Sequence, residues 1–182
     1  MQRIAVVEGG AYFHDFSLTD PKVNGLIAKR LYLRELQASD VDDIDVLLVM
    51  SCLNPDLLQQ KKAIITGFKG RGKKLVILAR NYVQEWYPDI VFTDTAVNFW
   101  WWLQAGADSG ISVVAKHHPI FDYMDEEAVK WHYHGMFSVP ENGCDGSVNI
   151  VKAREGGSIL YEQADGTLIT TLDPDFHHGS FF

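Results

Sequence analysis

Six of the seven histidines in the sequence fall in three short clusters, which are its strongest chemical signal. The clusters are His117-His118, His132 with His134, and His177-His178, while His14 stands alone. Histidine transfers protons near neutral pH and binds zinc and similar metal ions. The clusters therefore predict acid-base chemistry or a metal site, and a divalent metal ion is the one cofactor that the sequence indicates.

The closing segment DPDFHHGSFF combines two acids with two of these histidines. Asp175, His177 and His178 follow an expected strand at LITTL, and a carboxylate beside an imidazole can orient a general base. We predict catalytic roles for these three residues and for His134. A strand at YHGMF would place His132 and His134 on one face, because strand side chains alternate. The alternative is that the histidines are structural, bonded to backbone carbonyls or nearby acids.

A nucleophile is harder to identify than a base. Cys52 directly follows an expected strand at VLLVM, and a helix N-terminus after it could activate a thiol. A cysteine beside a strand is more often a small buried hydrophobe. A cysteine hydrolase that uses Cys52 is therefore one alternative. No G-x-S-x-G elbow, Walker motif or G-x-G-x-x-G loop occurs, which disfavours the usual serine hydrolases and nucleotide-binding proteins.

Composition limits the partners of this 182-residue chain, which has a formal net charge of -8. Nucleic-acid binding needs clustered Lys and Arg, and the one basic cluster, at residues 69–74, is typical of a solvated helix end. No apolar run approaches the roughly 18 residues of a membrane span, and the N-terminus does not read as a signal peptide. We expect a cytoplasmic protein with a small-molecule ligand and with no nucleic-acid or membrane partner.

Strands and helices alternate in the first half of the chain. The pattern predicts strands at residues 3–8, 46–50 and 75–78, an edge strand around residues 34–37, a helix that starts at Asp20-Pro21 and uses Val23, Leu26, Ile27 and Leu31, and a helix that starts at Asn54-Pro55. After residue 90, short strands alternate with glycine-containing turns. The fold class expected is α/β: a flavodoxin-like, doubly wound parallel sheet with a C-terminal antiparallel extension.

Ligands of such sheets bind at the carboxyl ends of the parallel strands. The loops there are EGGAYFHDF, SCLNPD and ARNYVQEWYPD, and we predict ligand-binding roles for His14, Arg80 and Asn81. The aromatic segment FWWW, residues 99–102, is expected to form an interface or a pocket lid, since tryptophan is enriched at both. Trp101 of this segment is the fourth predicted ligand-binding residue.

The strands RIAVVEGG, VLLVMS and KLVIL, the HHPIF turn and the closing TLDPDFHHG together resemble the ThuA-like (trehalose utilisation) group of the class I glutamine amidotransferase-like superfamily. The resemblance covers most of the chain and implies a single domain over residues 1–182. In the superfamily, a cysteine nucleophile lies at the elbow after the strand that LVIL resembles, and a late-loop histidine activates it. Here the elbow reads Ala79-Arg80-Asn81, while His177 and His178 resemble the late-loop partner.

The resemblance therefore implies an amidotransferase-like domain that lacks the nucleophile and binds or transforms a small polar ligand, such as a carbohydrate derivative. The rival hypothesis is a catalytically silent binding or assembly domain that uses residues 99–102 as an interface in a homo-oligomer. Whether the protein is an enzyme stays open between them. Relatives of this type continue into a helix, so the end at Phe181-Phe182 predicts a truncated chain whose last phenylalanines are core residues.

Overall fold

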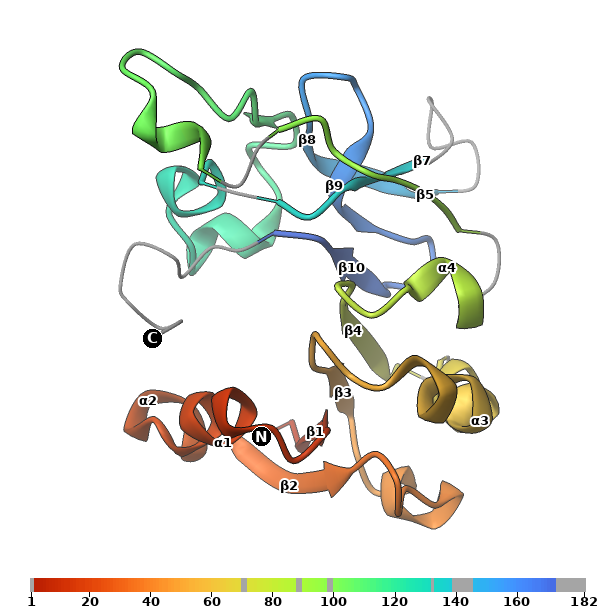
Figure 1. The fold of residues 1–182 in the computed structure, drawn as a ribbon. Helices are drawn as coiled ribbons and strands as arrows, with labels where there is room; N and C mark the ends of the chain where they lie inside the picture. The colour runs from red at the N-terminus through yellow and green to blue at the C-terminus, as the bar shows by residue number, and fades with distance from the viewer. Residues whose placement is uncertain are drawn as a thin grey trace. The chain divides into compact units, whose positions relative to one another are not determined.

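A computed structural model gives the fold and describes residues 2–69, 72–87, 90–97, 100–131, 133–138 and 146–172. The chain forms two compact units (Figure 1). The N-terminal unit is Met1–Asp89 together with Asp165–Leu168, and the C-terminal unit is Ile90–Ala164 together with Ile169–Phe182. The chain therefore returns briefly to the first unit after it has built most of the second.

The N-terminal unit is built on a parallel sheet with the strand order β2-β1-β3-β4. Buried side chains fill its central strands, and Ala5, Leu47 and Ile77 are all 0% exposed. Strands covered on both faces are nearly continuous apolar runs, which is the pattern of the sequence here. The strands are β1 (Ile4–Glu8), β2 (Ile27–Tyr32), β3 (Val46–Val49) and β4 (Lys74–Leu78).

Helices lie on both sides of this sheet, with α1 (Tyr12–Thr19) and α2 (Pro21–Asn24) on one side and α3 (Pro55–Thr66) on the other (Figure 1). A 3-10 helix, η1 (Ala38–Val41), precedes β3, and α4 (Val83–Trp86) follows β4. Helix α3 starts where the sequence predicts, because the Asn54 side chain accepts a hydrogen bond from the Leu57 N–H. No helix of the described residues is long and apolar enough to cross a membrane. The doubly wound α/β prediction is confirmed.

The helix predicted from Asp20-Pro21 to Leu31 is wrong beyond its first turn. Helix α2 ends at Asn24, and β2 begins at Ile27. Ile27 and Leu31 fit a helical spacing, but they also fit the strand alternation that the fold uses, with exposed residues between them.

The edge strand predicted around residues 34–37 is also wrong. These residues form a turn and the approach to η1, and β2 is itself the edge strand of the unit. Leu33 and Leu36 point into the core at 1% exposure each. Their apolar character therefore reflects a buried loop rather than a strand.

The C-terminal unit contains antiparallel pairs, as the sequence predicts. Strand β7 (Met136–Ser138) pairs with β5 (Val91–Thr93) and β9 (Ser158–Glu162), and β8 (Val148–Lys152) pairs with β9 and β6 (Ser112–Val113). Strand β10 (Leu168–Thr170) lies next to β9. Three 3-10 helices complete the described part of the unit, namely η2 (Trp101–Leu103), η3 (Pro119–Asp122) and η4 (Glu126–Val129).

An aromatic cluster around Phe137 forms the core of the antiparallel part. Phe137 is 1% exposed, and its ring lies 5.8 Å from that of Phe92 and 5.7 Å from that of Tyr161, edge to face in both cases. Gly135 lies against this cluster with a φ of +86°, and a Cβ there would be 2.3 Å from Phe92 Cζ. Only glycine fits this position without strain.

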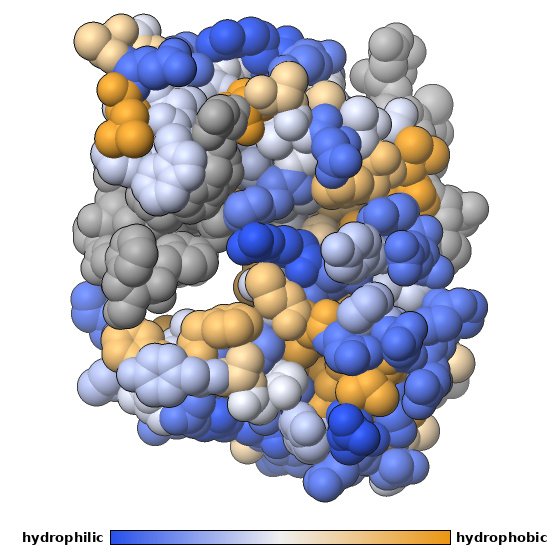
Figure 2. All heavy atoms as spheres, in the orientation of Figure 1, coloured by the Kyte–Doolittle hydropathy of each residue, from blue (hydrophilic) through white to orange (hydrophobic). Residues whose placement is uncertain are grey.

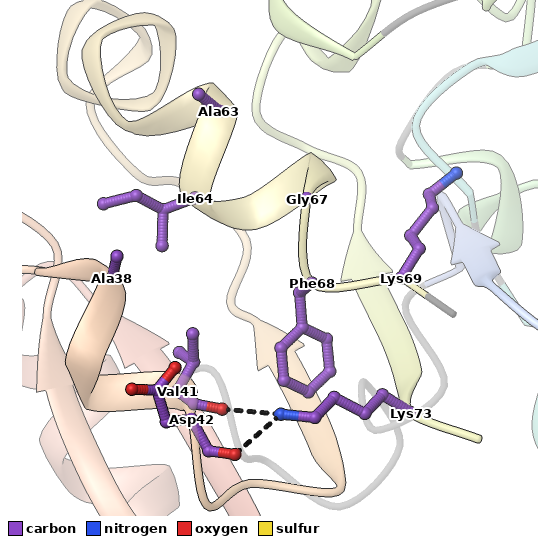
Figure 3. Close-up of a pocket in the computed structure, with 9 residues that line it drawn as sticks. All are labelled: Ala38, Val41, Asp42, Ala63, Ile64, Gly67, Phe68, Lys69 and Lys73. Carbon is purple, nitrogen blue, oxygen red and sulfur yellow. Dashed lines mark hydrogen bonds between the residues drawn. The ribbon is translucent and has the colours of Figure 1, made fainter. Parts of the chain in front are cut away.

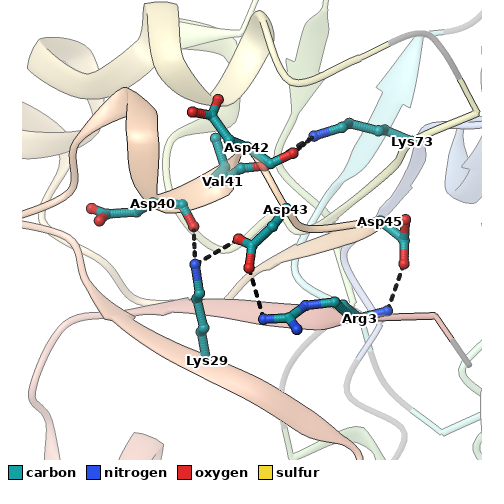
Figure 4. A network of polar contacts seen from close by, with 8 residues as sticks. All are labelled: Arg3, Lys29, Asp40, Val41, Asp42, Asp43, Asp45 and Lys73. Atoms are coloured by element: carbon teal, nitrogen blue, oxygen red, sulfur yellow. Dashed lines mark hydrogen bonds and ion pairs between the residues drawn. The ribbon is translucent and has the colours of Figure 1, made fainter.

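A network of charged groups fastens the segment before β3 to β1 and β2 (Figure 4). The Asp43 carboxylate accepts from Lys29 at 2.6 Å and from Arg3 at 2.7 Å. The Asp45 carboxylate accepts from the backbone N–H of Arg3, while Lys73 donates to the carbonyls of Val41 and Asp42. Cations from three other segments therefore hold the sequence ASDVDDID, two through the Asp43 carboxylate and Lys73 through backbone carbonyls.

Asp43 predicts a small acid-sensitive contribution to stability. The hydrogen bond from Lys29 lowers the pKa of Asp43, partial desolvation opposes this, and the charge of Arg3 adds to the lowering. The folded pKa lies below the unfolded value, so this stabilisation is present above about pH 3.9 and is lost as the pH falls below it. Asp43→Asn should flatten the acid side of the urea-midpoint against pH curve, with Asp122→Asn as the exposed control. Identical curves for wild type and Asp43→Asn would contradict the assignment.

Candidate functional site

Hydrogen bonds fasten the loops at the carboxyl ends of β1, β3 and β4 to one another. These loops are residues 9–11, 50–54 and 79–82, and they form the edge at which ligands of parallel sheets bind. His14 joins the first loop to the second, and Asn81 joins the second to the third. The predicted ligand-binding residues of this unit therefore do lie at one edge of one sheet.

His14 lies beneath the loops with no exposed surface. The Gly9 N–H donates to its Nδ1 at 3.1 Å, so the ring proton is on Nε2, which donates to the carbonyl of Ser51 at 2.8 Å. Both ring nitrogens are therefore bonded to the backbone. In this structure, His14 positions the two loops and has no nitrogen left for a ligand.

Asn81 connects the loop at residues 50–54 to the loop at residues 79–82, and it is 1% exposed. Its side-chain oxygen accepts from the Leu53 N–H at 2.7 Å, and its amide donates to the carbonyls of Met50 at 2.6 Å and Leu78 at 2.8 Å. Its own carbonyl accepts from the indole N–H of Trp86 at 3.1 Å. These bonds use both protons of the side-chain amide and engage its oxygen, so Asn81 shapes the edge from below.

Arg80, next to Asn81, has its side chain in solvent rather than in the core. Its side chain is exposed, and its carbonyl accepts from the Cys52 N–H at 2.8 Å. Its guanidinium makes no hydrogen bond or ion pair to any residue that the structure describes. The edge therefore presents a cation without a described partner, on a backbone that neighbouring loops hold in place.

Two residues at this edge have a left-handed backbone, Cys52 with a φ of +57° and Tyr82 with a φ of +50°. Such a conformation costs a non-glycine residue roughly 1–2 kcal/mol, and strain of this kind clusters at functional sites. Both side chains are exposed, that of Tyr82 by 62%. The expectation of a buried Cys52 is wrong, since its turn directs the thiol to solvent.

Tyr82 is the site residue that the sequence analysis missed. It lies between β4 and α4, at the apex of the strand-to-helix turn. Glycine or asparagine is the usual signal for a left-handed residue, and asparagine here stands one position earlier. No local pattern in the sequence therefore marks Tyr82.

The C-terminal unit holds two more of the predicted residues. His134 is half-buried, and its backbone N–H donates to the backbone carbonyl of Thr171. His134 lies before β7, so the strand predicted over YHGMF begins later than predicted, at Met136.

Trp101 packs against Trp131 with ring centroids 5.2 Å apart, and its indole N–H is buried without a hydrogen-bond partner among the described residues. The catalytic role of His134 and the ligand-binding role of Trp101 stay predictions.

His118 is bonded at both ring nitrogens, in agreement with a structural role for the HHPIF turn. The Ile120 N–H donates to Nδ1 at 3.3 Å, so Nε2 carries the proton and donates to Glu162 at 2.7 Å. This pair links η3 to β9 within the C-terminal unit. An imidazole does lie beside a carboxylate in this unit, but the pair is His118 with Glu162, and it connects two elements of the fold.

Asp175, His177, His178 and His132 lie outside the described residues. Within the described part of the chain, no three His, Cys, Asp or Glu side chains come together in a way that could hold a metal ion. The predicted catalytic loop and its metal therefore remain predictions.

A pocket of about 460 Å³ lies in the N-terminal unit, between η1 and the end of α3 (Figure 3). Lys73 bounds one side, where it donates to the carbonyls of Val41 and Asp42, and its ammonium lies 4.9 Å from the Phe68 ring centroid. The pocket is at the end of the sheet where β3 and β4 begin. It contains none of the predicted site residues of this unit, which gather at the opposite end.

Solved structures share this fold, and two of them illustrate the likeness. A Thermoplasma acidophilum protein described as part of a GMP synthase aligns with a TM-score of 0.54 and 13% identity, over 96% of this chain and 85% of the other. A Bacteroides uniformis protein described as ThuA-like aligns with a TM-score of 0.55 and 8% identity, over 95% of this chain and 82% of the other. No family model and no curated protein matches the sequence.

The fold is therefore that of a glutamine amidotransferase-like α/β protein. Within this class, the likeness extends both to a ThuA-like protein and to a GMP synthase component. The ThuA-like resemblance predicted from the sequence is thus confirmed at the level of fold. At these identities, the likeness carries no information about substrate.

Proposed function

We propose that the protein binds a small, polar, negatively charged ligand at the carboxyl edge of its parallel sheet. The observation that carries the proposal is Arg80, an exposed guanidinium without a described partner, next to the buried Asn81, whose side chain makes three hydrogen bonds. A fixed backbone lowers the entropic cost of binding, and Arg pairs strongly with carboxylate and phosphate. The Tyr82 ring and the Cys52 thiol lie on the loops that flank it.

A carbohydrate derivative with an acidic group is the ligand class that fits this edge best. The sequence resemblance to the ThuA-like (trehalose utilisation) group supports this class, because that group is associated with sugar metabolism. Amidotransfer fits this edge less well, because the strand-to-helix turn after β4 reads Arg80-Asn81-Tyr82 and has no cysteine or serine. The late-loop residues Asp175, His177 and His178 would supply acid-base chemistry.

The ligand-binding prediction can be tested with glucose 6-phosphate, inorganic phosphate and neutral trehalose as probes. The anionic probes should raise the Tm of the wild type, and Arg80→Ala should weaken their binding about tenfold or more without lowering the Tm of the free protein. Lys74→Ala, an exposed cation at the opposite end of β4, is the matched control. Equal anion binding by wild type and Arg80→Ala, measured by calorimetry, would contradict the proposal.

We further predict that the protein does not hydrolyse glutamine. Amidotransferases of this superfamily use a cysteine at the elbow, and residues 79–82, Ala-Arg-Asn-Tyr, contain neither a cysteine nor a serine. The measurement is ammonia release from glutamine by the wild type and by Cys52→Ser. Turnover that disappears in Cys52→Ser would instead support the cysteine hydrolase alternative, with a nucleophile on the neighbouring loop.

An assembly domain is the second candidate function. It is favoured by the exposed aromatic and apolar side chains of η2 and its preceding residue, Trp100 at 53%, Trp102 at 37% and Leu103 at 64%. Tryptophan is enriched at protein interfaces, and exposed surface of this kind is rarely left free. This candidate predicts that Trp100→Ser weakens self-association or partner binding and leaves anion binding unchanged.

A further inference from the structure

Helix α1 turns its aromatic side chains to solvent. Tyr12 is 80% exposed, Phe16 50% and Phe13 44%, whereas His14 and Leu18 on the other side of the helix are buried. At 3.6 residues per turn, the three aromatic residues fall within one arc of about 100°. A surface helix normally directs such a stripe to the core, so this outward aromatic face, residues 12, 13 and 16, is an exception.

The inner side of α1 is packed mainly by two other side chains. Leu18 packs in a cluster with Val6 and Met50, and His14 is bonded to the two loops. Tyr12 and Phe16 contact each other with ring centroids 6.2 Å apart. Figure 2 shows orange and pale side chains gathered over α1. Phe13 packs edge-on against the buried His14 ring, with centroids 4.4 Å apart, so it anchors one side of the face, while Tyr12 and Phe16 extend into solvent.

We infer that the outward aromatic face of α1 is the contact between two copies of this chain. Its three side chains expose roughly 350 Å², taking about 200 Å² for a whole aromatic side chain. Because interfaces are about 60% apolar, an interface built around this apolar area would bury about 600 Å² per partner, which is the low end for a specific dimer. Such a dimer would use the same face on both copies.

The charges around the face favour an identical partner over a strongly charged one. Asp15 of α1 pairs with Arg30 of β2 at 2.9 Å, and both side chains stay exposed, by 59% and 36%. Asp20 and Lys22 follow on the same segment, so acids and bases are balanced at the rim. In a two-fold dimer, each surface meets a copy of itself, so a balanced rim is self-complementary. The inference is independent of the proposed ligand site and of the η2 surface.

The test is sedimentation velocity and light scattering of the full chain over a wide range of concentrations. The wild type should form a dimer, and Tyr12→Ser and Phe16→Glu should each raise its dissociation constant about tenfold or more. Tyr123→Ser is the matched control, because Tyr123 is 94% exposed and lies on the C-terminal unit. Circular dichroism and Tm of each variant show whether it is folded.

Amide hydrogen exchange supplies a second measurement. Residues 12–16 should become protected as wild-type dimer forms, and this protection should be lost at low concentration. A monomer at every concentration would overturn the inference, as would a dimer that neither Tyr12→Ser nor Phe16→Glu weakens. A dimer that Trp100→Ser weakens but Tyr12→Ser does not would place the contact at η2 and would also overturn it.

Discussion

Replacing Asn81 by alanine is expected to destabilise the N-terminal unit by about 3 kcal/mol. The substitution removes three side-chain hydrogen bonds and leaves the buried Leu53 N–H and the Met50 carbonyl without their partner. A buried polar group that loses its partner costs its full desolvation energy, which is larger than the net gain of an ordinary hydrogen bond. The measurement is the free energy of unfolding in urea.

Two further variants make this result specific. Asn81→Asp keeps the shape but replaces the donor amide by an oxygen that faces the carbonyls of Met50 and Leu78, so it should destabilise nearly as much at neutral pH. Asn24→Ala, at the exposed end of α2, should change stability by less than about 0.5 kcal/mol. An Asn81→Ala protein as stable as Asn24→Ala would show that these bonds do not hold the loops.

Gly135→Ala is expected to destabilise the C-terminal unit by about 3 kcal/mol. The new methyl group would lie 2.3 Å from Phe92 Cζ and 2.8 Å from the Thr93 carbonyl oxygen, and the φ of +86° is itself unfavourable for alanine. The carbonyl belongs to the backbone of β5, so it cannot move aside as a flexible side chain would. Thermal or urea unfolding measures the loss.

Gly156→Ala separates the two causes. Gly156 has a φ of +90°, but no atom lies within 4 Å of its would-be Cβ, so only the backbone strain of about 1 kcal/mol applies. The difference in the free energy of unfolding between Gly135→Ala and Gly156→Ala measures the clash with β5. Adding Phe92→Leu to Gly135→Ala should recover part of the lost stability. Equal losses at the two glycines would mean that the aromatic cluster adapts to the methyl group at no cost.

The strands of the parallel sheet could be predicted because they are buried on both faces. VLLV and KLVIL are largely apolar, and α3 is marked by Asn54-Pro55 at its start and Gly67 at its end. Strand β2 could not be separated from a helix, because Ile27 and Leu31 fit both periods. Its pairing with β1 decides between them, and that pairing is a tertiary contact with no local signal.

The place of the candidate residues in the fold could be predicted, whereas their surroundings could not. Arg80 and Asn81 follow a predicted parallel strand, so their place at the sheet edge follows from topology. Which of them is exposed depends on how the loop at residues 50–54 packs, since Asn81 is buried only because it bonds to Leu53 and Met50. The backbone of Tyr82 has no sequence signal at all. Local pattern therefore predicts the sheet edge at which these residues lie, and tertiary hydrogen bonds determine which of them is exposed.

The N-terminal unit is discontinuous in sequence, and this affects when it can be completed. Its last piece, Asp165–Leu168, includes the carboxylate that pairs with Lys69 at 3.2 Å. During synthesis, the first 89 residues leave the ribosome long before this piece does, so they must wait for it in an unfinished state. Expressing them alone would omit this closing segment, and a useful shortened version must join it back through a linker. A single cut in the chain cannot release either unit whole.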